Sequence, residues 1–135
     1  MDPGAQLFAL STVSARSLVK AIGVQGMAHG VGISQVVPMP TNSLSSLSKE
    51  HLKVMAEYAP KTQISYLTME GHIVAKIIAE AARRGSGGRA GMISGLETLQ
   101  GFDAGGYYVN FGPKERRASR YVDVTVIGAN GELMR

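Results

Sequence analysis

The sequence contains no cysteine and no tryptophan among its 135 residues. The absence of cysteine excludes disulfides, thiolate metal ligands and cysteine nucleophiles. Long apolar runs are also missing, since none reaches the roughly 18–20 residues that a helix needs to span a bilayer. The opening residues, MDPGAQLFAL, carry an acidic side chain and no basic segment before their apolar stretch, so we expect no signal peptide there.

Charge of one sign is not concentrated in any segment. Fourteen Lys and Arg side chains and ten Asp and Glu side chains give a net charge of +4, which is compatible with nucleic-acid binding. The basic residues are scattered, however, and we expect no nucleic-acid partner. In the densest group, KERRASR at 114–120, we predict that Lys114, Arg116 and Arg117 lie on a solvated turn, with an anion or nucleic-acid site as the alternative.

The first part of the chain has the pattern of a strand, a helix and a second strand. Apolar segments at 6–12 and 29–37 have the length of buried strands. Between them, Ser14 can cap a helix at 15–22 that Gly23 ends. Such a unit predicts that the two strands pair in parallel while the helix covers the sheet, and therefore an α/β fold class.

The rest of the chain is predicted to be helical and then extended. The expected elements are a helix over TNSLSSLSKEHLKVMAEYAP that Pro60 ends, a brief strand at 63–67, a helix over 69–84 that Thr68 caps, a flexible connector at 85–91 and a helix at 92–99. Alternating apolar residues in GGYYVNFG and RYVDVTVIGANGELM then indicate strands that join the sheet in antiparallel fashion.

No group of polar residues has the spacing of a catalytic or metal site. His29, His51 and His72 lack partners at metal-ligand spacing, and we expect each to be a surface or strand-end residue. Glu70 and His72 are two residues apart on a helix and point to different faces, so they form no acid–base pair. The segment RRGSGGRAG lacks the Lys-Ser/Thr ending of a P-loop. We therefore expect neither an enzyme nor a bound cofactor or metal.

Tyr66 is the aromatic residue with the clearest binding context. It lies just before the predicted helix start at Thr68. A helix start presents free N–H groups and the positive end of the dipole, and an aromatic ring beside it can cover an apolar group of a ligand. Packing into the core is the alternative for this ring.

Five separated blocks of the sequence occur in an order that resembles one family. The blocks are GVGISQVVPMP, YAP, SYLTMEGHIVAKIIAEA, LETLQGFDAGGYYVNFGP and SRYVDVTVIGANGEL. They are similar to the region near the C-terminus of the type I periplasmic solute-binding proteins of the branched-chain amino-acid (Leu/Ile/Val-binding) group, which feed ABC transporters. The segment PKERRASR is more basic than the family's usual turn, where a histidine and a glycine are common.

The resemblance implies two α/β lobes joined by three crossover strands, with the ligand held in the cleft between the lobes. It places residues 1–37 in the second lobe, residues 38–118 in the first lobe and residues 119–135 in the final crossing strand and tail. The early first-lobe segments, which supply most polar contacts to the amino acid in the family, have no counterpart in the sequence. We therefore expect a C-terminal portion of such a protein.

The same resemblance implies a hinge crossing near residues 36–41. Pro38 and Pro40 fix φ and lack an N–H donor, so neither can continue a central strand. We expect Val37 and the two prolines to be hinge residues of this crossing, and Ser119 to be the hinge residue of the last one. A rigid crossing segment suits closure of the two lobes, because the change in the angle between the lobes is then absorbed by a few residues at the ends of helices and strands.

The function that the resemblance implies is binding without chemistry. Tyr66 and Glu70 are the expected ligand-binding residues, for an amino acid or a similar small molecule. The expected partners are this ligand, the membrane permease of an ABC transporter and a second copy of the chain, in a periplasmic or extracytoplasmic location. The alternative is a ligand-sensing or oligomerising module of the same fold without a transport role.

Overall fold

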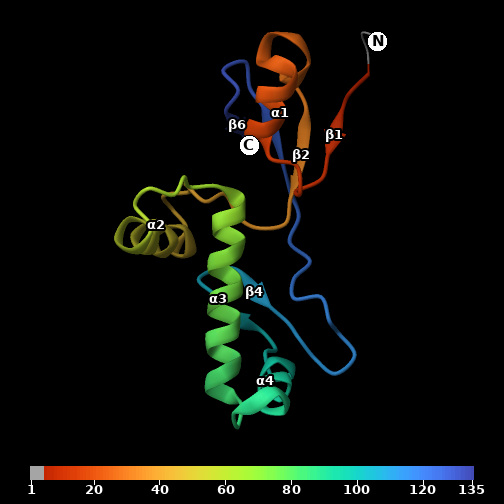
Figure 1. Cartoon of the computed structure of the whole chain (residues 1–135). Helices are drawn as coiled ribbons and strands as arrows, with labels where there is room; N and C mark the ends of the chain where they lie inside the picture. Colours follow the sequence, from red (N-terminus) through yellow and green to blue (C-terminus); the bar gives the residue numbers. More distant parts are fainter. Residues whose placement is uncertain (1–4) are drawn as a thin grey trace. The chain divides into compact units, whose positions relative to one another are not determined.

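The computed structural model describes residues 5–135, with the backbone alone for residues 24–26. The chain folds as two compact units, which we call unit 1 and unit 2 (Figure 1). Unit 1 runs to Val36 and resumes over Tyr121–Arg135, and unit 2 is Val37–Arg120. The elements are β1 (Phe8–Ala9), α1 (Ala15–Ile22), the π-helical η1 (Gly23–Ala28), β2 (Gly32–Gln35), α2 (Ser46–Tyr58), α3 (Tyr66–Arg84), α4 (Gly88–Glu97), β3 (Phe102–Asp103), β4 (Tyr108–Val109), β5 (Asp123–Ile127) and β6 (Leu133–Met134).

Unit 1 contains a mixed four-stranded sheet in the order β1-β2-β5-β6. β1 pairs in parallel with β2, with Phe8 opposite Gly32, which confirms the predicted parallel pair. The expectation of a buried strand over 6–12 is wrong, because β1 has only two residues and the side chains of Phe8 and Leu10 are exposed. β5 pairs with β2 in antiparallel fashion, with Val126 opposite Gly32, and β6 pairs with β5 in the same way. β5 and β6 are thus an antiparallel addition to a parallel unit, as RYVDVTVIGANGELM predicted. The strand expected in GGYYVNFG is wrong as part of this sheet, because β4 pairs with β3 in a separate hairpin.

α1 connects the two parallel strands and begins and ends where the sequence predicted. The Ser14 Oγ accepts a hydrogen bond from the Ser17 N–H at 3.4 Å, which satisfies one donor of the first turn. Gly23 has a φ of 74° and donates its N–H to the carbonyl of Val19. A left-handed φ is strained for residues with a side chain, so glycine suits the end of this helix.

The core of unit 1 lies between α1 and one face of the sheet. Its fully buried residues are Ala28, Val31, Ile33 and Ile127, against which α1 packs its apolar side chains. On β5 the buried positions are Thr125 and Ile127, whereas Val122 and Val124 are exposed. The buried Thr125 hydroxyl accepts a hydrogen bond from the Gln35 Nε2 at 3.0 Å, which satisfies two polar groups inside the sheet.

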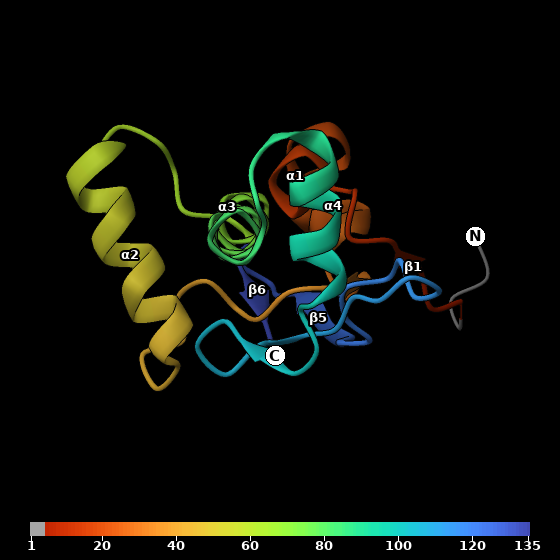
Figure 2. The ribbon, with the colours of Figure 1, turned by 90° about the horizontal axis from the view of Figure 1, so that it is seen from below.

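Unit 2 is organised around α3, the longest helix of the chain. Figure 2, which looks along α3, shows α2 and α4 on different sides of it. The core consists of buried side chains from α2, from α3 and from the segment after α4: Leu47, Met69, Ile73, Ile77, Ala81, Leu99, Ala104, Tyr107 and Val109. The buried positions of α3 recur every four residues, which gives the helix one apolar face.

The start of α3 differs from the prediction. The helix begins at Tyr66, and Ser65 rather than Thr68 is its N-cap. The Ser65 Oγ accepts from the Thr68 N–H at 3.2 Å, and the Thr68 Oγ1 accepts from the Ser65 N–H at 2.9 Å. This capping box holds the backbone in a helical turn, so the brief strand predicted at 63–67 is wrong.

α4 also begins earlier than predicted, at Gly88 rather than near residue 92. The expected flexible connector at 85–91 is therefore wrong in its second half. A Cβ atom on Gly85 would overlap the carbonyl oxygen of Gly91, and one on Gly91 would lie too close to the backbone of Ser86. These glycines allow two helices to approach closely.

A short hairpin of β3 and β4 follows α4, with Phe102 opposite Val109. The Asp103 Oδ1 accepts hydrogen bonds from the backbone N–H groups of Gly105 and Gly106, which closes the turn. These bonds lower the pKa of the Asp103 carboxyl because they stabilise its charged form.

Candidate functional site

The two predicted ligand-binding residues lie one turn apart on α3. Tyr66 is the first residue of the helix and is half-buried, and Glu70 is exposed. Positions four residues apart share one side of a helix, so the two residues lie on the same face of α3. The pair can offer an aromatic surface and a negative charge, a combination that suits a small molecule with an apolar part and an ammonium group. That these two residues bind a ligand stays a prediction.

The predicted hinge residues lie beside the boundaries between the two units. Val37 is the first residue of unit 2 and is buried, and the chain returns to unit 1 after Arg120. Pro40 is buried and Pro38 is half-buried, while Ser119 lies next to the second boundary. The hinge role of these residues stays a prediction.

Two histidines form a buried pair between α2 and α3. His51 has an exposed fraction of 0 %, and the side chain of His72 is 9 % exposed. Their ring centroids are 5.5 Å apart. The expectation that both are surface or strand-end residues is therefore wrong. His51 is four residues after the buried Leu47, and His72 is three residues after the buried Met69, so helical spacing could have placed both rings on the buried faces.

Charged groups surround this histidine pair. Glu50 lies with its Oε1 at 3.7 Å from the Nε2 of His72, and it forms an ion pair with Lys76 of α3. Burial lowers the pKa of the His51 ring and the neighbouring His72 lowers it further, while the backbone of Thr68 acts against this shift. Burial also lowers the pKa of His72; Glu50 acts against this shift and Lys76 reinforces it.

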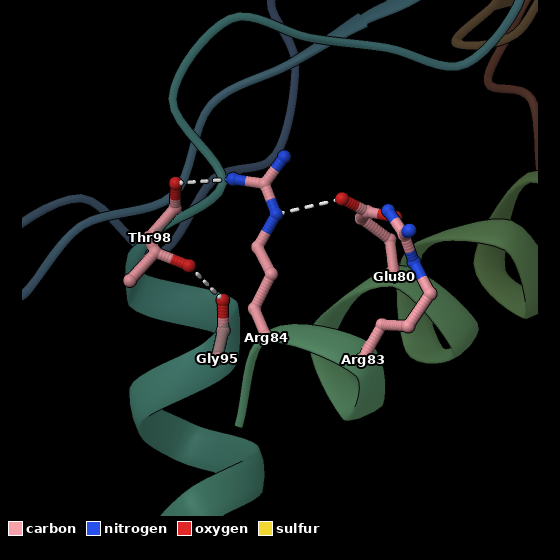
Figure 3. Close-up of polar contacts among 5 residues, drawn as sticks. All are labelled: Glu80, Arg83, Arg84, Gly95 and Thr98. Carbon is pink, nitrogen blue, oxygen red and sulfur yellow. Dashed lines mark hydrogen bonds and ion pairs between the residues drawn. The ribbon is translucent and has the colours of Figure 1, made fainter. Parts of the chain in front are cut away.

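A second polar cluster connects the end of α3 to the end of α4 through hydrogen bonds (Figure 3). The Arg84 Nε donates to the Glu80 Oε1 at 2.7 Å, and the Arg84 Nη1 donates to the carbonyl of Thr98 at 2.9 Å. The Thr98 hydroxyl donates in turn to the carbonyl of Gly95 at 2.7 Å. Hydrogen bonds from Arg83 and Arg84 lower the pKa of the Glu80 carboxyl. This cluster has a structural role, because its groups bond to one another and to the ends of helices.

The basic turn is exposed, as predicted. Lys114, Arg116 and Arg117 all have exposed side chains, and the Arg116 Nη2 forms an ion pair with Glu97 at 2.8 Å. Over residues 5–135 the structure has no group of three or more His, Asp or Glu side chains that could hold a metal ion. No helix in this part of the chain is both long enough and apolar enough to cross a membrane.

Three solved structures match almost the whole chain. An extracellular ligand-binding receptor from Verminephrobacter eiseniae is 34 % identical with a TM-score of 0.84, over 99 % of this chain and 38 % of its own. A possible leucine/isoleucine/valine-binding protein from Rhodopirellula baltica is 31 % identical with a TM-score of 0.84, over 98 % and 36 %. A substrate-binding periplasmic protein from Ralstonia solanacearum is 30 % identical with a TM-score of 0.85, over 98 % and 38 %. No protein-family model matches the chain, and neither does any curated protein.

These matches confirm the predicted fold class and the family resemblance. By fold and sequence the chain is similar to one part of the periplasmic binding proteins of the branched-chain amino-acid group. That family consists of binding proteins and not of enzymes, as the sequence predicted. The chain spans 36–38 % of the length of the matched structures.

Proposed function

We propose that the chain is part of an extracytoplasmic solute-binding protein that holds a small amino-acid-like ligand for an ABC transporter. The observation that carries this proposal is the match of 98–99 % of the chain to three ligand-binding proteins at 30–34 % identity. A shared fold alone would support less, because function depends on the site and not on the fold. The membrane partner in this function is the permease of the transporter.

The division into two units supports the two-lobe organisation on which this function depends. The chain leaves unit 1 after Val36 and returns to it at Tyr121. Both changes of unit lie beside the predicted crossings, at Val37, Pro38 and Pro40 and at Ser119. We propose that unit 1 is part of the second lobe and unit 2 part of the first lobe, with ligand bound near Tyr66 and Glu70.

A calorimetric titration of the chain with a panel of free amino acids tests the proposal. We expect heat of binding from apolar L-amino acids, because an aromatic ring and a carboxylate suit an apolar side chain and an ammonium group. Charged amino acids of either sign serve as the matched controls and should bind more weakly. An absence of binding for every amino acid, by a chain that unfolds cooperatively, would contradict ligand binding by these residues.

The alternative is a ligand-sensing or oligomerising module of the same fold without a transport role. Exposed apolar side chains on α3 favour assembly: Leu67, Val74 and Ile78 are 77 %, 46 % and 50 % exposed. Large exposed apolar patches normally mark an interface. We propose a homodimer, since twofold symmetry is the commonest closed arrangement, and exchange of an element across residues 36–41 is a low-cost route to it.

A further inference from the structure

The His51–His72 pair has an unusual hydrogen-bonding situation for a buried group. Within residues 5–135, neither ring nitrogen of His51 has a hydrogen-bond partner, and the Nε2 of His72 has none either. Buried polar groups are nearly always hydrogen-bonded, so these three nitrogen atoms call for an explanation. The two rings lie tilted against each other at 58°, as in an apolar contact between neutral rings.

The surroundings of the pair determine what a proton would do there. Glu50 of α2 is the carboxylate closest to His72, but it is already paired with Lys76 of α3. Lys76 also acts on Asp103 of the hairpin and lowers the pKa of that carboxyl. A second proton would place two positive rings 5.5 Å apart, with the ammonium group of Lys76 as a third positive charge in the same interface. At such distances like charges in a buried site repel strongly.

We propose that the His51–His72 pair makes the packing of α2 against α3 acid-sensitive, so that α2 detaches from α3 when the rings take up protons. Neutral rings fill the interface as apolar groups do. The backbone of Thr68 partly offsets the cost of a proton on the fully buried His51, but burial is the larger effect. Protonation therefore favours a movement of α2 that exposes the ring to water. The pair is thus a switch between a packed and a loosened unit 2.

The direction of the pH dependence follows from the lowered pKa values of both rings. In the unfolded chain histidine has a pKa of about 6.5, whereas the folded chain holds both rings to lower values. The unfolded state therefore takes up protons first as the pH falls. The stability from the neutral pair is complete above about pH 6.5, and it is lost as the pH falls from there toward the folded pKa values. Carboxylates titrate mainly below about pH 4.5, outside this window.

A proton titration of the intact chain by NMR tests the switch directly. We expect the ring signals of His51 and His72 to titrate below the ordinary histidine pKa of about 6.5. The backbone amides of α2 should shift or broaden over the same pH range, and their protection from hydrogen exchange should fall at least about tenfold relative to α1. Titration of both buried rings at the ordinary histidine pKa, or unchanged α2 amides, would overturn the proposal.

Variants separate the switch from general acid sensitivity. We expect the melting temperature of the wild type to fall between about pH 7.5 and about pH 5, and His51→Leu to remove most of this fall, because leucine fills the site without binding a proton. His29→Gln is the matched control and should retain the full decrease. If His51→Leu does not fold, His72→Gln and the wild-type NMR titration decide. An undiminished decrease in a folded His51→Leu variant would also contradict the switch.

Discussion

A Cβ atom on Gly95 of α4 would overlap the backbone carbonyl oxygen of Ala81 on α3. The two helices are therefore in contact through their backbones, and the residue at position 95 has no room for a side chain. Ala81 itself is fully buried and is the last buried position of α3. The spacing of the two helices depends on the absence of one methyl group.

We expect Gly95→Ala to lower the free energy of unfolding by about 1–3 kcal/mol, the range of overpacked sites. Urea denaturation of the purified variant measures the change. The matched control is Gly71→Ala in α3, where an added Cβ meets nothing within 4 Å. Alanine is the better helix former, so this control should raise the stability by about 0.5–1 kcal/mol. Equal changes of the same sign in both variants would contradict the close contact.

The Glu80 cluster predicts a second pH dependence, at lower pH than that of the histidines. Its arginine partners lower the pKa of the Glu80 carboxyl. The stability that it contributes is therefore present above the unfolded pKa of about 4.3 and is lost as the pH falls through the folded value. Glu80→Gln should remove this acid loss, whereas Glu57→Gln, a control for which the structure has no ion pair among the described residues, should retain it. The melting temperatures of the wild type and the two variants, measured between about pH 5 and about pH 2.5, make the comparison. The same dependence on pH in Glu80→Gln and in the wild type would contradict this contribution of Glu80 to stability.

Patterns of spacing predicted most of the backbone. The parallel strands at 6–12 and 29–37 and the helix between them were found because apolar periodicity and a Ser14 cap are local signals. The start of α3 was misplaced because two neighbouring residues, Ser65 and Thr68, can both cap a helix. The sequence does not show which one does when they bond to each other.

The polar clusters were harder to predict, because they depend on contacts between distant residues. His51 and His72 are 21 residues apart and meet through the packing of two helices, for which their sequence contains no motif. Gly85 and Gly91 were taken as part of a flexible connector, although both pack closely against a neighbouring backbone, whereas Gly87 and Gly88 have open space around them. The absence of a side chain allows both backbone flexibility and close packing. Only the residues around a glycine show which of the two applies.

We predict that the basic turn binds nucleic acid only weakly. Lys114, Arg116 and Arg117 are exposed, but Arg116 is already paired with Glu97, and the segment has no interleaved aromatic residues for base stacking. Fluorescence anisotropy with single-stranded and double-stranded oligonucleotides at physiological salt should give no submicromolar affinity. Submicromolar binding that is lost when these three residues become alanine would contradict the prediction.

We predict that Tyr66→Ala weakens ligand binding without changing the fold. Tyr66 is half-buried at the first position of α3, where Ser65 and Thr68 form the cap independently of the ring. The far-ultraviolet circular dichroism should therefore stay the same, while calorimetry with the best-binding amino acid shows a loss of affinity. Tyr58→Ala, at an exposed position near the end of α2, is the control and should bind as the wild type does. Unchanged affinity in Tyr66→Ala would remove this residue from the site.

The last prediction concerns assembly through α3. Leu67, Val74 and Ile78 follow one another at seven and four residues, so they form one exposed apolar stripe on this helix. We expect light scattering at micromolar concentration to give the mass of a dimer, because a second copy can cover the stripe and remove its apolar surface from water. Ile78→Glu places a charge in the stripe and should shift the mass to that of a monomer. Ala79→Glu, which is exposed but lies off the stripe, is the matched control and should remain dimeric. A monodisperse wild-type monomer with cooperative unfolding would show that the chain closes its own core, and it would contradict both the dimer and the division of these 135 residues between two lobes.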